Sequence, residues 1–205
     1  MSDGDPHIDL NPNLGEFFGD LVTGAARERG VRASPAVEVY LASLLAELAH
    51  PGAPCAEVLD RPFALQLADA ATAAGTERFE RLRTLGDGVL YTSGFFAERL
   101  VQRGVELDYA RSVGATAYVR AAAMLRHGRR DSPGPVEVLE ELARSFRAFA
   151  ELLAEVADRL RARSASSDKS VLSLYERWLR TGSASLAEAL GERGLVPLRR
   201  AGGTC

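Results

Sequence analysis

Residues 135–163, PVEVLEELARSFRAFAELLAEVADRLRAR, decide the fold, because their large apolar residues recur at alternating intervals of three and four. This heptad stripe consists of Leu139, Leu142, Phe146, Phe149, Leu153, Val156 and Leu160. It predicts one continuous helix, roughly 43 Å long at about 1.5 Å per residue. Beside the stripe, alanine recurs every seven residues at positions 143, 150 and 157, where a two-stranded coiled coil carries charges. We therefore expect a bundle that packs closely around this central helix and buries Phe146 and Phe149.

The composition of the whole chain also favours an all-α fold. The 205 residues include 33 alanines and 28 leucines but a single isoleucine, Ile8, and helix formers of this kind disfavour sheet. Apolar periodicity and turn residues predict about eight helices. Their ranges are 13–30, 35–50, 60–74, 77–104, 108–127, 135–163, 171–179 and 184–191. We expect a flexible acidic tail at 1–12, a single helical domain at 13–197 and a flexible C-terminal tail at 198–205.

Glycines interrupt the predicted fourth helix, ERFERLRTLGDGVLYTSGFFAERLVQRG, at Gly86, Gly88 and Gly94. Each costs about 1 kcal/mol relative to alanine inside a helix, so a kink or a close helix contact is expected there. The predicted fifth helix also has a small-residue side, formed by Gly114, Ala117 and Ala121.

The charge balance and the termini bear on partners and location. A net charge of −3 and a pI of about 5.7 provide no basic surface for nucleic acid. No apolar stretch approaches the roughly 20 residues that span a bilayer, and the start, MSDGD, lacks the features of a signal peptide. We therefore expect a cytoplasmic protein with no nucleic-acid or membrane partner.

Motifs for metals and for nucleophilic catalysis are incomplete. Glu47 and His50 have the Glu-x-x-His spacing of di-iron bundles, but only one copy exists, and with Tyr40 and Ser43 they are better explained as the polar flank of a helix. The two cysteines, Cys55 and Cys205, lack ligand spacing. The chain also lacks a nucleophile elbow, a phosphate-binding loop and a dinucleotide fingerprint. No metal, cofactor or catalytic residue is expected.

One polar segment stands out inside the fourth helix. Arg83, Asp87 and Tyr91 are spaced by four and would form a hydrogen-bonded ladder on the surface. Alternatively, the helix breaks at Gly86 and Asp87 caps a new helix. The third interpretation is a polar cluster inside the bundle, where glycines let a ligand approach. Its members would be Arg83, Asp87, Tyr91, Ser93, Tyr109 and Tyr118.

The stretches LRTLGDGVLYTSGFFAERL, DYARSVGATAY and YERWLRTGS resemble those of a family of all-helical bacterial proteins with no assigned activity, over about residues 60–190. The resemblance implies a bacterial, cytoplasmic protein and supplies no catalytic residues.

Two hypotheses for the function follow. The first is a non-enzymatic interaction or regulatory protein, a homo-oligomer that self-associates through the small-residue faces of the predicted fourth to sixth helices. The alternative is a small-molecule-binding bundle or an enzyme that uses the polar cluster around Asp87.

Overall fold

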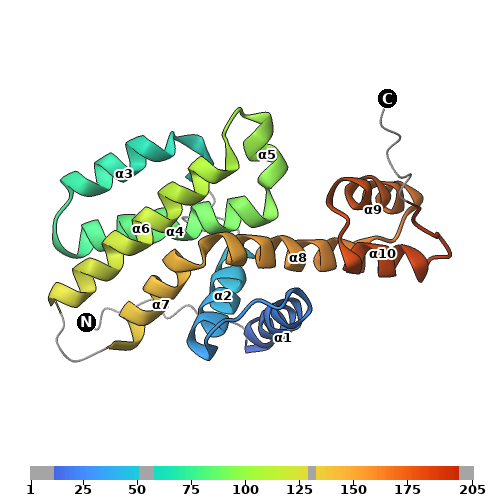
Figure 1. The fold of residues 1–205 in the computed structure, drawn as a ribbon, viewed down its shortest axis with the longest axis horizontal. Helices are drawn as coiled ribbons and strands as arrows, with labels where there is room; N and C mark the ends of the chain where they lie inside the picture. The colour runs from blue at the N-terminus through green and yellow to red at the C-terminus, as the bar shows by residue number, and fades with distance from the viewer. Residues whose placement is uncertain (1–11, 51–57, 129–132, 199–205) are drawn as a thin grey trace, which may run out of the picture. The chain divides into compact units, whose positions relative to one another are not determined.

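The computed structural model describes residues 12–50, 58–128 and 133–198, and this part of the chain is all-α (Figure 1). Its helices are α1 (Pro12–Arg29), α2 (Pro35–Leu48), α3 (Phe63–Thr72), α4 (Gly75–Phe95), α5 (Ala97–Gln102), α6 (Leu107–Gly128), α7 (Pro133–Arg144), α8 (Phe146–Ser164), α9 (Asp168–Thr181) and α10 (Ala184–Gly191). The predicted fold class is confirmed. Among these helices none has both the length and the apolar character needed to cross a membrane. Most of the two predicted tails, 1–11 and 199–205, lies outside the described residues, as do both cysteines.

Several helix ends follow directly from the local sequence. The Ser34 hydroxyl accepts a hydrogen bond from the backbone N–H of Val37 at 3.3 Å, which caps α2 ahead of Pro35. Gly30 and Gly182 end α1 and α9 with φ angles of 63° and 66°, in the left-handed region that glycine adopts without strain. The predicted start of α2 and the predicted end of α1 rest on the same residues, Ser34, Pro35 and Gly30, whereas Gly182 was not predicted as a helix end.

The predicted fourth helix, 77–104, is divided at a position that the glycine pattern did not indicate. Helix α4 passes through Gly86, Gly88 and Gly94 and ends at Phe95, and α5 begins at Ala97. The backbone at Phe96 leaves the helical region, with φ −130° and ψ 30°. The helix therefore breaks after the last glycine, and Asp87 lies inside α4 instead of capping a new helix.

The prediction of one continuous helix over 135–163 is also wrong. It is divided into α7 and α8 at Ser145. The N–H of Ser145 still donates to the carbonyl of Glu141, and its own carbonyl accepts from the N–H of Phe149, both at 3.0 Å. Because helical hydrogen bonds are kept on both sides, the heptad spacing continues across the break and hides it. The two breaks, at Phe96 and Ser145, account for the ten helices of the described ranges, where about eight were predicted.

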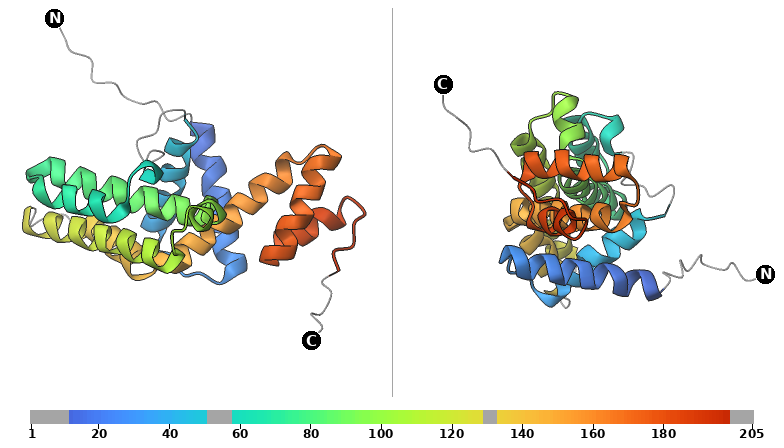
Figure 2. Two further views of the ribbon diagram at one scale, coloured as in Figure 1. Left: turned by 90° about the horizontal axis from the view of Figure 1, so that it is seen from above. Right: turned by 90° about the vertical axis from the view of Figure 1, so that its right-hand side faces the viewer.

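The chain divides into two compact units, Met1–Leu153 and Ala154–Cys205, with the boundary inside α8. Within the first unit, α6 lies beside both α4 and α7, and α2 contacts α1 and α7 (Figures 1 and 2). The single domain expected over 13–197 stays a prediction. The two compact units share helix α8, and a division into such units does not decide whether they are separate domains.

Glycines set the close packing of the first unit. A Cβ on Gly86 of α4 would lie 2.6 Å from the ring of Tyr118, and a Cβ on Gly114 of α6 would lie 2.4 Å from the ring of Phe146. The expected close helix contact is therefore present. Ala117 and Ala121 are fully buried as well. The small-residue faces proposed for self-association are thus filled by the chain's own side chains.

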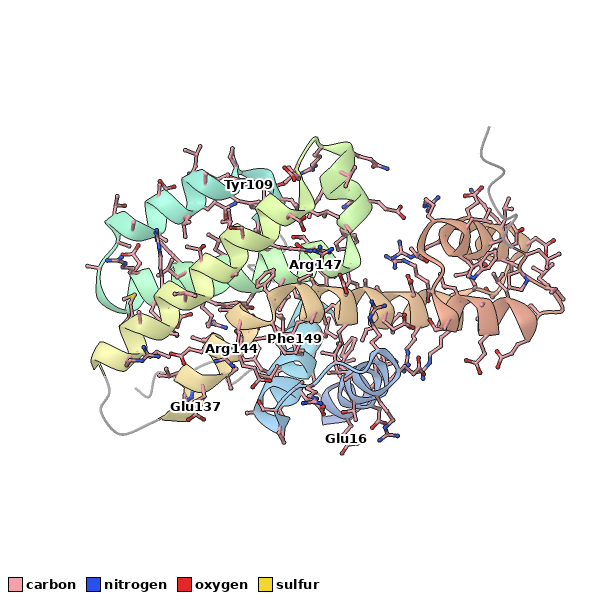
Figure 3. All side chains as sticks on the ribbon, viewed as in Figure 1. Glu16, Tyr109, Glu137, Arg144, Arg147 and Phe149 are labelled. Atoms are coloured by element: carbon pink, nitrogen blue, oxygen red, sulfur yellow. The ribbon has the colours of Figure 1, made fainter. Side chains whose placement is uncertain are left out.

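The predicted apolar stripe forms part of the core. Phe146 and Phe149 are 3% and 0% exposed, which confirms their predicted burial. Arg147 and Phe149 leave α8 on opposite sides (Figure 3), and the Arg147 side chain is 69% exposed. The helix therefore has one apolar and one charged face over this stretch.

The second unit has its own core around Trp178, the only tryptophan of the chain. The buried residues of this core are Ala162, Ala165, Leu174, Trp178, Leu186, Ala189 and Leu190. A capping box between Ser167 and Ser170 starts α9, and the hydroxyl of Ser183 caps α10. Two short helices and the end of α8 thus enclose one apolar cluster.

Candidate functional site

The sequence-predicted polar cluster exists around Asp87, but with different members. Asp87 lies in the middle of α4 and is 3% exposed. Arg83 precedes it by one turn on the same helix, Tyr118 comes from α6, and Tyr40 comes from α2. We call these four residues the Asp87 cluster. It joins three helices that are far apart in the sequence.

Hydrogen bonds within the Asp87 cluster are short and converge on one carboxylate. The hydroxyls of Tyr40 and Tyr118 both donate to Asp87 Oδ1, at 2.6 and 2.7 Å. Arg83 Nη1 donates to Asp87 Oδ2 at 3.3 Å, and its Nη2 also donates to Glu80 at 2.9 Å. Both phenol protons and one guanidinium are therefore directed at Asp87, as expected for a buried carboxylate that needs partners.

Burial dominates the electrostatics of the Asp87 cluster. It raises the pKa of Asp87 to about 6, although the hydrogen bonds from the two tyrosines and the charge of Arg83 act to lower this pKa. Burial also raises the pKa of Tyr118 and of Tyr40 far above the usual value for a phenol, and the negative charge of Asp87 adds to both shifts. Both tyrosines are therefore neutral donors at every physiological pH.

The geometry of the Asp87 cluster suits it to hold helices together. Its donors and acceptors satisfy one another, and each bond crosses from one helix to another or links adjacent turns of α4. Two pockets, described below, open on the surface of the first unit, and no member of the cluster lines either of them. A fully connected buried network of this kind gives a core a specific packing arrangement.

The other predicted site residues lie apart from the Asp87 cluster. Tyr91 packs against Phe95 and Phe96, with ring centroids 4.8 and 5.4 Å away. Ser93 is 1% exposed, and its hydroxyl has no hydrogen-bond partner among the described residues. Tyr109 is 45% exposed on α6 and lines a surface pocket. The structure thus brings together Arg83, Asp87 and Tyr118 of the six predicted residues.

Sequence reasoning missed Tyr40, which it placed on the polar flank of the second helix. The only available signal was a tyrosine beside an apolar face, a position where a phenol can bury its ring and direct its hydroxyl at a polar partner. Forty-seven residues separate it from Asp87. Nothing in helical periodicity pairs two residues at that separation.

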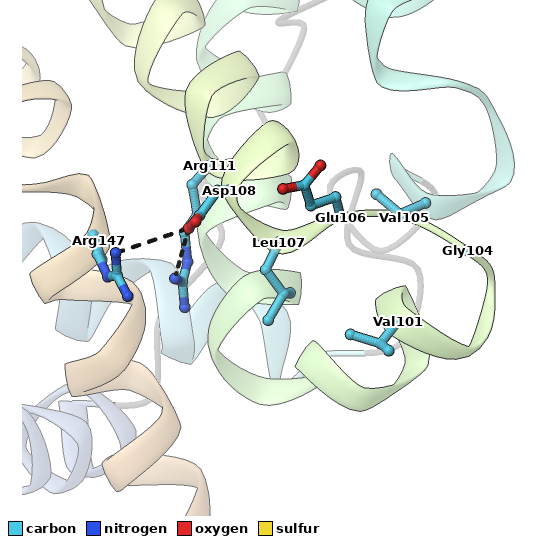
Figure 4. A pocket seen from close by; sticks show the side chains of 8 residues that line it. All are labelled: Val101, Gly104, Val105, Glu106, Leu107, Asp108, Arg111 and Arg147. Atoms are coloured by element: carbon cyan, nitrogen blue, oxygen red, sulfur yellow. Dashed lines mark hydrogen bonds and ion pairs between the residues drawn. The ribbon is translucent and has the colours of Figure 1, made fainter.

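Two pockets flank the connection between α5 and α6. The larger, of about 550 Å³, lies at the start of α6 and is drawn in Figure 4. The smaller, of about 310 Å³, contains Tyr109, Phe63 and Arg103, and Arg103 donates to the backbone carbonyl of Leu59 at 2.7 Å. Val105 lines both pockets.

A second group of buried charges lies in the second unit and was not predicted. Asp158 is 3% exposed and accepts hydrogen bonds from Arg177 of α9 and from Arg161, the latter at 3.2 Å. Glu155 forms an ion pair with Arg159 at 3.7 Å. Burial raises the pKa of Asp158, and the charge and hydrogen bond of Arg177 act in the opposite direction. The Asp158–Arg177 pair connects α8 to α9, and the other two pairs lie within α8.

Across the described ranges, no three histidine, cysteine, aspartate or glutamate side chains are grouped so that they could hold a metal ion. No family model, no curated protein and no solved structure matches the chain.

Proposed function

We propose that the protein is a non-enzymatic interaction protein whose partner is a second copy of itself. One observation carries this proposal, the apolar surface of the second unit. Leu172 and Leu179 of α9 are 58% and 44% exposed, and Val196 and Leu198, in the segment after α10, are 77% and 74% exposed. Among these side chains, Leu172 and Leu179 share one face of a helix, and exposed apolar side chains grouped in this way mark an interaction site.

The face of α9 is suited to a symmetric contact. Leu172 and Leu179 are seven residues apart, so they lie two turns apart on the same side of the helix, with Tyr175 between them. In an antiparallel pairing of two α9 helices, Leu172 of each copy meets Leu179 of the other. The same apolar groups then meet on both sides of the axis, as a two-fold interface requires.

The buried charges beneath this face support its role as a rigid surface. Arg177, whose side chain is 14% exposed, binds Asp158 of α8 from the opposite side of α9. Together with Trp178 in the core, this ion pair fixes the rotation of α9, so that Leu172 and Leu179 point outward. A surface that is ordered before it binds loses less entropy on association.

The alternative hypothesis, a ligand site or enzyme around Asp87, has no comparable support. The hydrogen bonds of Asp87 go to the chain's own side chains, and neither pocket reaches it. The cluster explains how α2, α4 and α6 are held together without a ligand.

Light scattering of the full chain and of two double variants tests the proposal. The variant Leu172→Glu with Leu179→Glu places charge on the α9 face and should remain at the monomer mass of 22.0 kDa. The matched control, Val39→Glu with Val119→Glu, changes two valines of the first unit that are 66% and 56% exposed and should associate like the unmodified protein. Equal association of all three proteins would refute the α9 contact.

A further inference from the structure

The larger pocket, at the start of α6, has one charged wall and one apolar wall. Arg111 of α6 and Arg147 of α8 form the charged wall, with Asp108 between them (Figure 4). On the other side stand Val101 of α5 and Val105, with Leu107 in the middle. The pocket lies entirely within the first unit and is remote in sequence from the α9 face.

Arg111 has hydrogen-bonding capacity that the described chain does not use. Its side chain is 15% exposed, and its Nε is shielded from solvent without a hydrogen-bond partner among the described residues. Its ion pair with Asp108 joins Nη1 to Oδ1 at 3.4 Å, which is long for a charge-assisted bond. A guanidinium has five donors in a planar fork, and a buried donor without a partner is unfavourable.

Asp108 interacts only weakly with Arg111 and Arg147. The same oxygen, Oδ1, lies 4.0 Å from Arg147 Nη1, so one carboxylate oxygen serves two guanidiniums at long distances. The Asp108 side chain is 67% exposed, and surface pairs of this kind contribute little. A carboxylate from solution can therefore displace Asp108 into water and bind the fork of Arg111 with both of its oxygens.

The apolar wall of the pocket determines which group the ligand carries next to its carboxylate. Val101 is 58% exposed, and an alkyl chain that starts at the arginines and runs past Leu107 would cover it. Glu106 and Asp108 add two negative charges to the lining, which oppose a multiply charged anion such as phosphate. From these observations we propose that the pocket binds a small monoanion that consists of one carboxylate and a short apolar chain.

Isothermal titration of the full chain with octanoate, below the concentration at which it forms micelles, tests the proposal. Octanoate should bind more tightly than acetate or inorganic phosphate. Arg111→Gln should weaken its binding by about tenfold or more, the loss expected for a charge-assisted pair, and Arg147→Gln by a smaller factor. Asp108→Asn should tighten binding several-fold, because a competing carboxylate is removed. Arg120→Gln, an exposed position on α6 outside the pocket, should leave binding unchanged.

Two features keep the proposal falsifiable even where Arg111→Gln affects folding. Arg147 is mostly exposed, so its variant tests the charged wall in a folded protein. If Asp108 and Arg111 only stabilised the fold, Asp108→Asn would not increase the affinity for octanoate. The proposal is overturned if octanoate fails to bind, if acetate or phosphate binds equally well, or if neither Arg147→Gln nor Asp108→Asn changes the affinity for octanoate.

Discussion

Gly114 of α6 lies against the ring of Phe146, the first residue of α8, so closely that a Cβ on the glycine would stand 2.4 Å from Cζ of the ring. The same Cβ would lie 3.0 Å from a methyl group of Val89 on α4. The absence of a side chain at Gly114 thus allows three helices to meet at one point. This contact lies next to the bend at Ser145, which directs α8 away from the line of α7 (Figure 1).

Gly114→Ala should therefore destabilise the protein, although alanine is the better helix former. Overpacking of a tight core costs about 1–3 kcal/mol, which outweighs the gain of about 1 kcal/mol in helix propensity. Gly19→Ala is the matched control, because Gly19 also lies inside a helix and a Cβ there would have no neighbour within 4 Å. Chemical denaturation should show opposite signs for the two variants, and stabilisation by both would contradict the packing at Gly114.

Phe146→Ala should lower the free energy of unfolding by about 3–5 kcal/mol, the usual cost of removing a buried phenylalanine ring. Its neighbour Arg147 is 69% exposed, and Arg147→Ala should change that free energy by only about 0.5 kcal/mol. Alanine is a better helix former than either residue, so helix propensity cannot cause a loss of stability in either variant. Equal shifts of the denaturation midpoint in the two variants would show that the Phe146 ring does not pack in the core.

Asp87→Asn should change how stability depends on pH. Burial raises the pKa of Asp87 to about 6, above the value near 4 of an unfolded chain, so the folded protein holds this proton more tightly. The resulting stabilisation is complete below about pH 4 and is lost as the pH rises through about 6. Relative to Asp87→Asn, the unmodified protein should lose about 3 kcal/mol over this window.

Denaturation of both proteins at a series of pH values measures this difference. Because the two chains share every other titratable group, the carboxylates remote from Asp87 contribute equally to both curves and cancel. A difference that stays constant between pH 4 and pH 7 would show that the pKa of Asp87 is the same in the folded and unfolded states.

Ser93→Ala should leave the fold intact and raise the free energy of unfolding by about 1 kcal/mol. The Ser93 hydroxyl is buried in α4 without a hydrogen-bond partner among the described residues, and burying such a group costs about 1–3 kcal/mol. Thr92→Ala is the control, because the neighbouring Thr92 hydroxyl donates to the carbonyl of Gly88 at 2.7 Å. Loss of stability in Ser93→Ala equal to that in Thr92→Ala would mean that the Ser93 hydroxyl does have a partner.

The helices were predictable because local chemistry determines them. The cap at Ser34, the glycine after α1 and the heptad stripe all act within a few residues. The bend at Ser145 was not predictable, since one turn residue that keeps helical hydrogen bonds on both sides does not disturb the spacing of Leu142, Phe146 and Phe149. The spacing of apolar residues shows which face of a helix is apolar, but it does not show where the helix axis bends.

The candidate sites show the same division between local and distant contacts. The Arg83–Asp87 pair follows from i,i+4 spacing and was predicted. Tyr40 and the pocket between Arg111 and Arg147 depend on contacts between helices, which a single sequence does not contain. Tyr91 was expected beside Asp87, but it packs on Phe95 and Phe96 at the end of α4, where the helix breaks.

Sedimentation equilibrium of the unmodified chain, from micromolar to millimolar concentration, measures self-association without any substitution. The average mass should rise with concentration from 22.0 kDa toward twice that value, and Leu172→Glu with Leu179→Glu should abolish the rise. A mass that stays at 22.0 kDa at every concentration would show that the protein does not self-associate.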